Sequence, residues 1–180
     1  MGLFRFLARV TIGLLFVGHG TQKLFGWFGG HGPEGTGQYF ESLGLKPGRR
    51  NALLSGIAEG GGGALFAAGA ATPLSAAAIS GSMITAIKTV HLEKGVWVSA
   101  GGYEYNLVLL AAVFGLTENG PGPWSVDGVL GRERWGTGWA LAALAVGAAG
   151  SAAVLAAAAH EQPDETTEQP APEHEAVAAS

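Results

Sequence analysis

Five stretches of the chain are dominated by apolar residues, and polar or glycine- and proline-rich segments separate them. These stretches cover residues 4–26, 51–70, 73–91, 103–117 and 137–159. Their lengths are close to the ~20 residues that an α-helix needs to cross the hydrocarbon core of a bilayer. The pattern therefore predicts an all-α, polytopic membrane protein. It would consist of a four-helix bundle within residues 1–117 and a fifth hydrophobic helix, accessory or lipid-facing, at residues 137–159.

The segments between the apolar stretches are predicted to lie at or outside the membrane surface. Residues 27–50 contain many glycines and indicate a loop, in which residues 37–45 have the pattern of a short amphipathic helix on the interface. Residues 118–136 are predicted to form a polar loop rich in glycine and proline. Residues 160–180 are acidic and lack apolar periodicity, so we expect a disordered tail.

The composition also favours a membrane protein. Only 13% of the residues are charged, whereas a soluble domain has about 25%. Six of the 14 acidic residues lie in the last twenty positions, so the formal net charge of −4 reflects the tail. We therefore expect a multi-pass protein of the cell membrane, with the lipid bilayer as a partner and no nucleic-acid partner. The absence of cysteine excludes a thiol relay, a disulfide and a self-ligated iron–sulfur cluster.

The first apolar stretch has some features of a signal peptide, because Arg5 and Arg9 precede it. No small-x-small cleavage site follows it, so a retained first span is favoured over a cleaved one. Four basic residues fall on each predicted side of the membrane, and the positive-inside rule does not decide between the two orientations. The arginines that flank the first helix favour a cytoplasmic N-terminus.

Several polar residues interrupt the apolar stretches, late in the first and third and early in the second and fourth. Because successive spans run in opposite directions, these positions share one leaflet in either orientation. Ionisable groups at such depth usually face a protein interior or a wet cavity. We predict that three of them exchange protons in a catalytic centre: Glu59, Lys88 and Glu104. We predict that four others bind a ligand beside it: His19, Lys23, His91 and Asn106.

Charge balance supports a shared polar cluster, since two lysines and two carboxylates leave no net charge if the histidines are neutral. Lys23–Glu59 and Lys88–Glu104 are the expected ion pairs, although the swapped pairing satisfies the same balance. For residues near the ends of the spans, snorkelling into the headgroups is the competing interpretation. Arg9 is alone in the opposite leaflet and is predicted to snorkel.

Two other types of site have partial support in the sequence. The four-glycine run at residues 60–63 lacks the Lys-Ser/Thr of a phosphate loop, and Gly56-x-x-x-Gly60 instead has the spacing of a helix-packing seam. A metal site formed by the histidines and carboxylates of the cluster, or a haem between His19 and His91, is chemically conceivable. No local motif such as HExxH supports either, so we expect no metal.

These motifs together resemble those of the DoxX family. The matching features are Arg9-x-x-x-Gly13, FVGHGxxKLFG at residues 16–26, Glu59 in a glycine-rich second span, Lys88 in the third span and GGYEYN at residues 101–106. The resemblance covers residues 4–117 and implies a four-helix integral membrane protein. The family is named for a subunit of a thiosulfate:quinone oxidoreductase. Its mycobacterial relatives are associated with a membrane oxidoreductase complex that contains superoxide dismutase and a sulfurtransferase.

The resemblance, rather than the residue spacing, implies quinone-linked redox work. We expect a membrane subunit of an oxidoreductase that uses a quinone, with soluble redox or sulfurtransferase-type proteins as partners. The alternative is a non-catalytic assembly protein that recruits such enzymes. A small transporter is less favoured, because the chain lacks repeated broken half-helices. The sequence leaves open whether the protein is itself an enzyme, and it is compatible with a homo-oligomer.

Overall fold

The computed structural model describes residues 2–160, and these residues form helices and connecting turns without a β-strand. The helices are α1 (Gly2–Phe25), α2 (Gly32–Ser42), α3 (Gly48–Ala68), α4 (Thr72–Ala86), α5 (Glu104–Asn119), α6 (Val126–Val129) and α7 (Thr137–His160). Short 3₁₀ turns are η1 (Trp27–Gly29), η3 (Leu92–Lys94) and η4 (Val98–Ala100), and a π-helical turn, η2 (Ile87–His91), continues α4. The predicted all-α class is confirmed. The predicted acidic tail, apart from His160, lies outside the described residues.

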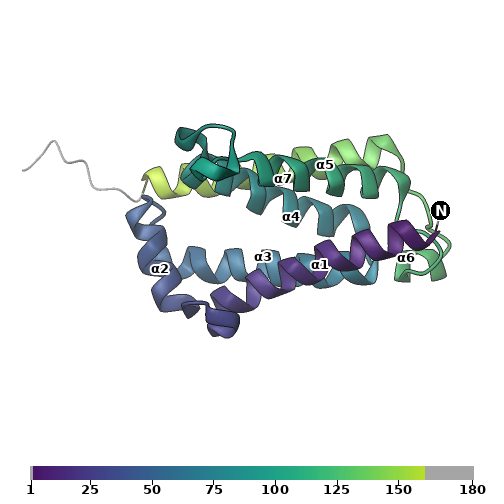
Figure 1. Ribbon diagram of the computed structural model, residues 1–180, viewed down its shortest axis with the longest axis horizontal. Helices are drawn as coiled ribbons and strands as arrows, with labels where there is room; N and C mark the ends of the chain where they lie inside the picture. The colour runs from purple at the N-terminus through teal and green to yellow at the C-terminus, as the bar shows by residue number, and fades with distance from the viewer. Residues whose placement is uncertain (1, 161–180) are drawn as a thin grey trace, which may run out of the picture.

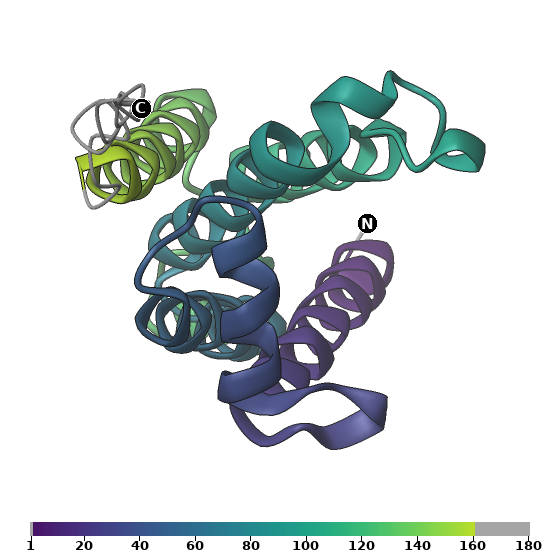
Figure 2. The ribbon, with the colours of Figure 1, turned by 90° about the vertical axis from the view of Figure 1, so that its left-hand side faces the viewer.

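The five long helices run roughly along the long axis of the molecule (Figure 1). Helix α3 packs against α1 and α4, and α4 also packs against α5 and α7. Helices α1 and α5 lie near each other at the end that carries α6 and diverge toward the end that carries α2, so they stand apart in the end view of Figure 2. These two ends are called the α6 end and the α2 end below.

A small apolar core joins the long helices. Phe16 of α1, Phe66 of α3 and Ile79 of α4 are almost fully buried, and Leu109 and Val113 of α5 complete the cluster. Each of these side chains contributes about 1.5–3 kcal/mol relative to an exposed position in water.

Each predicted apolar stretch corresponds to one long helix, with ends displaced by a few residues. By length and composition, α1 and α7 are long and apolar enough to cross a membrane. Helices α4 and α5 contain 15 and 16 residues and are shorter than a typical span. The short helix predicted at residues 37–45 overlaps α2, which begins earlier, and the loop predicted at residues 118–136 contains α6.

Glycine residues allow α1 and α3 to pack in close contact. A Cβ on Gly20 would lie 2.4 Å from the Cα of Gly60, and a Cβ on Gly13 would lie 2.5 Å from the carbonyl oxygen of Gly63. A Cβ on Gly63 would in turn lie 2.6 Å from the carbonyl oxygen of Gly13. The predicted packing seam of small residues is therefore confirmed.

Helix α7 packs closely against α4, a contact that its uniformly apolar sequence did not predict. A Cβ on Gly147 would lie 2.7 Å from the carbonyl oxygen of Ala77, so α7 lies directly against α4. The hydroxyls of Thr85 and Ser151 also share a hydrogen bond of 2.9 Å between these helices. The opposite face of α7 is exposed and apolar, as Leu141 shows. The sequence of α7 did not reveal which face is buried, because both faces are apolar and the buried one differs mainly in having small residues.

Candidate functional site

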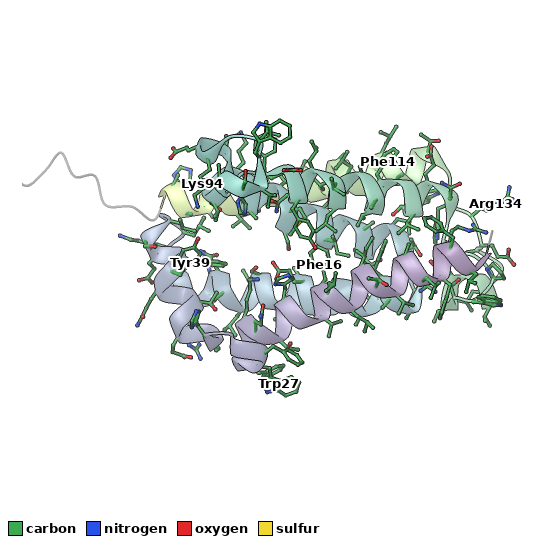
Figure 3. All side chains as sticks on the ribbon, viewed as in Figure 1. Phe16, Trp27, Tyr39, Lys94, Phe114 and Arg134 are labelled. Atoms are coloured by element: carbon green, nitrogen blue, oxygen red, sulfur yellow. The ribbon has the colours of Figure 1, made fainter. Side chains whose placement is uncertain are left out.

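A cavity of about 860 Å³ lies between α2, α3, α4 and α7 at the α2 end, with Lys23 of α1 at its edge. Its volume falls within the usual range of ligand pockets. Polar side chains line it beside apolar ones such as Leu54 and Val154. Tyr39, which also lines it, lies beside the open region between the helices in Figure 3. The cavity therefore suits an amphipathic ligand.

An ion pair forms part of the cavity wall. The ammonium group of Lys23 lies 2.5 Å from Oε2 of Glu59, and their side chains are 20% and 8% exposed. The hydroxyl of Ser55 donates a hydrogen bond of 3.3 Å to Oε1 of Glu59. Gly56 brings the two helices close enough for this pair, since a Cβ there would lie 3.3 Å from the Cβ of Lys23. The predicted Lys23–Glu59 pair is confirmed.

A polar stripe on α3 extends from this ion pair along the cavity. Asn51, Ser55 and Glu59 are spaced four residues apart, so they lie on one face of the helix, and all three line the cavity. Asn51 is buried, and in the part of the chain that the structure describes its Nδ2 atom has no hydrogen-bond partner. A buried, unpaired amide is unfavourable unless a partner binds to it. Asn51 and Ser55 were not predicted as site residues, although their spacing from Glu59 was visible in the sequence.

The opposite wall comes from α4 and its π-helical turn. The hydroxyls of Thr85 and Thr89 line the cavity and donate hydrogen bonds of 2.9 Å to the carbonyl groups of Gly81 and Thr85. His91 lies in the π-helical turn, with Nδ1 2.7 Å from the carbonyl oxygen of Gly101. Because a carbonyl only accepts, Nδ1 carries the proton, and Nε2 of a neutral His91 ring is an acceptor. Single π-helical turns are frequent at functional sites.

Two predicted catalytic residues do not line this cavity. The side chain of Lys88 is exposed, and the carboxylate of Glu104 accepts a hydrogen bond of 2.9 Å from the backbone N–H of Val98. Within residues 2–160, the expected Lys88–Glu104 ion pair is not formed. The physical reason is the π-helical turn: its i→i+5 geometry holds more residues per turn than an α-helix. Lys88 and His91 therefore do not share the face that α-helical spacing predicts.

Two predicted ligand-binding residues also lie away from the cavity. His19 is exposed, with Nδ1 3.1 Å from Oε1 of Gln22. Asn106 is buried in α5, and its amide lies 3.4 Å from the sulfur of Met83. The expectation that all seven polar residues share one site is therefore wrong. The structure brings together Lys23, Glu59 and His91.

The metal and haem alternatives find no support in the described part of the chain. No group of three or more His, Asp or Glu side chains within residues 2–160 has an arrangement that holds a metal ion. Within residues 2–160, His91 lines the cavity at the α2 end, and His19 is not among the residues that line it.

The structure also corrects the prediction for Arg9. Arg9 does not snorkel: it is 1% exposed, and its guanidinium donates hydrogen bonds to the carbonyls of Phe66, Ala67 and Trp124. Phe66 and Ala67 belong to the last turn of α3, where backbone carbonyls lack intrahelical partners. A cation at a helix C-terminus is favourable. Arg9 therefore caps the C-terminal end of α3 from a buried position.

Asp127 has a matching role at the start of α4. Its carboxylate is 3% exposed and accepts hydrogen bonds from the N–H groups of Ala71 and Thr72, the hydroxyl of Thr72 and the indole of Trp135. Burial raises the pKa of Asp127, but the hydrogen bonds from Thr72, Trp135 and Ala71 outweigh it, so the pKa lies below its ordinary value. The predicted polar loop at residues 118–136 thus forms part of the fold.

Comparison with known proteins identifies one family. Residues 4–92 match the DoxX family model, and this range runs from α1 to the start of η3. It includes the three residues that the structure brings together at the cavity: Lys23, Glu59 and His91. No curated protein and no solved structure matches the chain. Through residues 4–92, the chain belongs to the DoxX family.

Proposed function

We propose that the protein crosses the cell membrane several times, with α1, α3, α4 and α5 as a transmembrane bundle and α7 as a fifth span. The continuous helix of α4 and η2 runs over residues 72–91, close to the ~20 residues that a span requires. Large apolar side chains on the outer faces support contact with lipid, since a soluble protein rarely exposes so many of them. Examples are Leu14, Ile57, Leu107, Val108 and Leu141.

Single-cysteine labelling tests this topology. Because the sequence contains no cysteine, only the introduced thiol can react. The variants Lys94→Cys and Arg132→Cys place thiols at the exposed α2 and α6 ends. A membrane-impermeant maleimide added to intact cells is expected to label one of them and to reach the other only after lysis. Labelling of both from the same side would contradict the proposed topology.

We further propose that the cavity binds a quinone and that the protein is a membrane subunit of a quinone-linked oxidoreductase. The observation that supports this function is the Lys23–Glu59 pair, placed on a cavity wall beside the unpaired Nδ2 of Asn51. The free energy needed to desolvate two buried charges often exceeds the free energy gained from their attraction. A buried ion pair therefore often contributes little to the stability of the fold. Its place beside a cavity is better explained by binding a polar group.

The donors on this wall fit a quinone. The ammonium of Lys23 and the amide of Asn51 both donate hydrogen bonds, and carbonyl oxygens accept them. The apolar walls suit a ring and an isoprenoid chain. Reduction of a quinone takes up two electrons and two protons, and we propose that a soluble redox or sulfurtransferase-type partner exchanges the electrons.

The residues of the chain would then manage protons. In the Lys23–Glu59 pair, the ammonium of Lys23 can give a proton to a ligand bound at the wall, and the carboxylate of Glu59 can accept one from it. His91 donates from Nδ1 to the Gly101 carbonyl, which leaves its Nε2 as an acceptor suited to exchange of protons between the cavity and water. This assignment removes Lys88 and Glu104 from the predicted catalytic centre.

The proposal is tested by titrating the purified protein with decylubiquinone and measuring binding through the quenching of tryptophan fluorescence. Lys23→Met and Asn51→Leu are expected to weaken binding roughly tenfold or more, because each removes a hydrogen-bond donor from the wall. Glu34→Gln is the control, because it breaks the exposed Arg49–Glu34 pair and does not touch the cavity.

Unchanged binding in the wall variants would exclude the cavity as the quinone site. The assembly alternative makes a different prediction: the same variants would lower the melting temperature or abundance and leave quinone-dependent turnover of the complex unaffected. Measuring both properties on each variant separates the two functions.

A further inference from the structure

A second cavity, of about 960 Å³, lies between α1 and α5 near the α6 end. It shares no lining residue with the candidate site. Small or apolar residues form most of its length, among them Ala8, Ile12, Ala111, Ala112, Gly115 and Leu116. Two arginines, Arg5 and Arg134, lie at its polar end together with Glu118. The cavity is thus an apolar groove with a charged mouth.

The two arginines converge on the same point of the backbone. Arg5 donates hydrogen bonds of 2.8 and 3.4 Å to the carbonyls of Asn119 and Gly120. The backbone of Arg134 lies against Gly120, since a Cβ on that glycine would be 2.5 Å from the Cα of Arg134. Figure 3 places Arg134 at the α6 end of the molecule. Arg5 and Arg134 therefore both line the same end of the cavity.

Within residues 2–160, neither arginine forms an ion pair with a carboxylate. The ion pairs within residues 2–160 are Lys23–Glu59 and Arg49–Glu34. The Nε atom of Arg5 is buried and has no hydrogen-bond partner among the described residues. Glu118, the carboxylate at the mouth, instead accepts a hydrogen bond of 2.7 Å from the hydroxyl of Thr137. The mouth carries more positive than negative charge, so it favours an anion.

The groove has room for an acyl chain. Its lining residues extend from Phe4 to Ile12 on α1 and from Ala111 to Asn119 on α5, which corresponds to about 12 Å of each helix. At Gly115, a Cβ would meet no atom within 4 Å, so the groove is open there. The arginines lie near the end of the bundle, at the depth of lipid headgroups in the proposed topology.

We propose that this groove binds one anionic phospholipid of the surrounding membrane. Arg5 and Arg134 hold its phosphate, because the planar guanidinium fork matches phosphate geometry. One acyl chain lies along the groove, where it covers the apolar walls. A free phosphate would leave these walls uncovered, so the lipid accounts for both parts of the cavity. The proposal is independent of quinone binding at the other end.

Native mass spectrometry of the full-length protein in detergent tests the headgroup contacts. The protein is titrated with phosphatidylglycerol or phosphatidylcholine of identical acyl chains, and bound lipids are counted. We expect phosphatidylglycerol to bind with roughly tenfold preference, and Arg134→Gln to abolish the preference, since each basic group near a membrane surface attracts anionic lipid. Lys46→Gln, an exposed change at the α2 end, is the control. Equal binding of the two lipids, or an unchanged preference in Arg134→Gln, would overturn the proposal.

A competitor and a groove-filling variant test the acyl-chain contacts. Excess glycerophosphoglycerol, which has the headgroup without acyl chains, is expected not to displace the lipid. Displacement would indicate a site for a soluble anion and would overturn the lipid assignment. Gly115→Leu fills the groove and is expected to reduce phosphatidylglycerol binding severalfold, while Gly61→Leu, at an equally open glycine outside both cavities, leaves it unchanged. Equal binding by these two variants would also overturn the proposal.

Discussion

Asp127 and Thr72 lie 55 residues apart in the chain, and Oδ2 of Asp127 accepts hydrogen bonds from both the hydroxyl and the N–H of Thr72, at 2.7 and 2.9 Å. Helix α4 begins at Thr72, and the preceding residue, Ala71, has no side chain that can cap it. Asp127 therefore supplies the cap from a distant segment. This contact fixes the connection between α5 and α7 to the start of α4 and closes the α6 end of the bundle.

Replacement of Asp127 is expected to destabilise the protein. Asp127→Ala removes the acceptor from the N–H groups of Ala71 and Thr72 and from the Trp135 indole, and buried donors left unpaired cost about 1–3 kcal/mol. Thermal unfolding in detergent measures the change. Glu133→Gln, an exposed substitution in the same connection, serves as the control and should leave the melting temperature unchanged. Equal melting temperatures for the two variants would show that the cap is dispensable.

Acidification should remove the same stabilisation. The pKa of Asp127 in the folded protein lies below its ordinary value of 3.8, so the folded state favours the carboxylate. Its contribution is fully present above the unfolded pKa and is lost as the pH falls through the folded pKa, mainly below about pH 4. The stability difference between the wild type and Asp127→Asn should therefore shrink from pH 6 to pH 3. Chemical unfolding at both pH values measures it, and a constant or growing difference would contradict the assignment.

The sequence predicted the features that depend on local pattern. The long apolar stretches located all five long helices, and the glycine spacing located the seam between α1 and α3. Glu59 could be identified because a carboxylate within an apolar helix needs a partner, although charge balance left open whether Lys23 or Lys88 is that partner. These conclusions require only helical periodicity and the alternating direction of successive spans.

The remaining features depend on contacts that no local pattern encodes. Arg9 was expected to reach the membrane surface, but its acceptors are carbonyls at the end of α3 and in the connection before α6. Asp127 was assigned to a loop, since nothing in its neighbourhood indicates that it caps α4. Lys88 was placed in the cluster on the assumption of α-helical geometry, which the π-helical turn η2 does not obey.

The seam between α1 and α3 should respond asymmetrically to added methyl groups. A Cβ on Gly20 would lie 2.4 Å from the Cα and N of Gly60, so Gly20→Ala must push the helices apart. A Cβ on Gly60 would lie 3.6 Å from Gly20, an ordinary contact, so Gly60→Ala should be tolerated. We expect Gly20→Ala to lower stability by about 1–3 kcal/mol, as overpacking does. Unfolding of both variants, with Gly18→Ala as an unhindered control on α1, checks this order; equal losses for Gly20→Ala and Gly60→Ala would contradict the geometry.

The Lys23–Glu59 pair should appear as strong coupling in a double-mutant cycle. Glu59→Leu alone leaves the Lys23 ammonium in a largely buried position without its partner, whereas Lys23→Met with Glu59→Leu removes both charges. Because an unpaired buried charge is worse than an apolar pair, the double variant should unfold at higher denaturant than Glu59→Leu alone. Neighbouring residues couple by about 0.5–3 kcal/mol, and the lower part of that range is expected because the Lys23 side chain is 20% exposed. The exposed Arg49–Glu34 pair provides the comparison and should show much weaker coupling.

If the effects of the two single changes at Lys23 and Glu59 simply add, the two charges do not stabilise each other, and the prediction is wrong. A double variant that is stable but no longer binds quinone would instead separate the role of the pair in binding from its role in the fold.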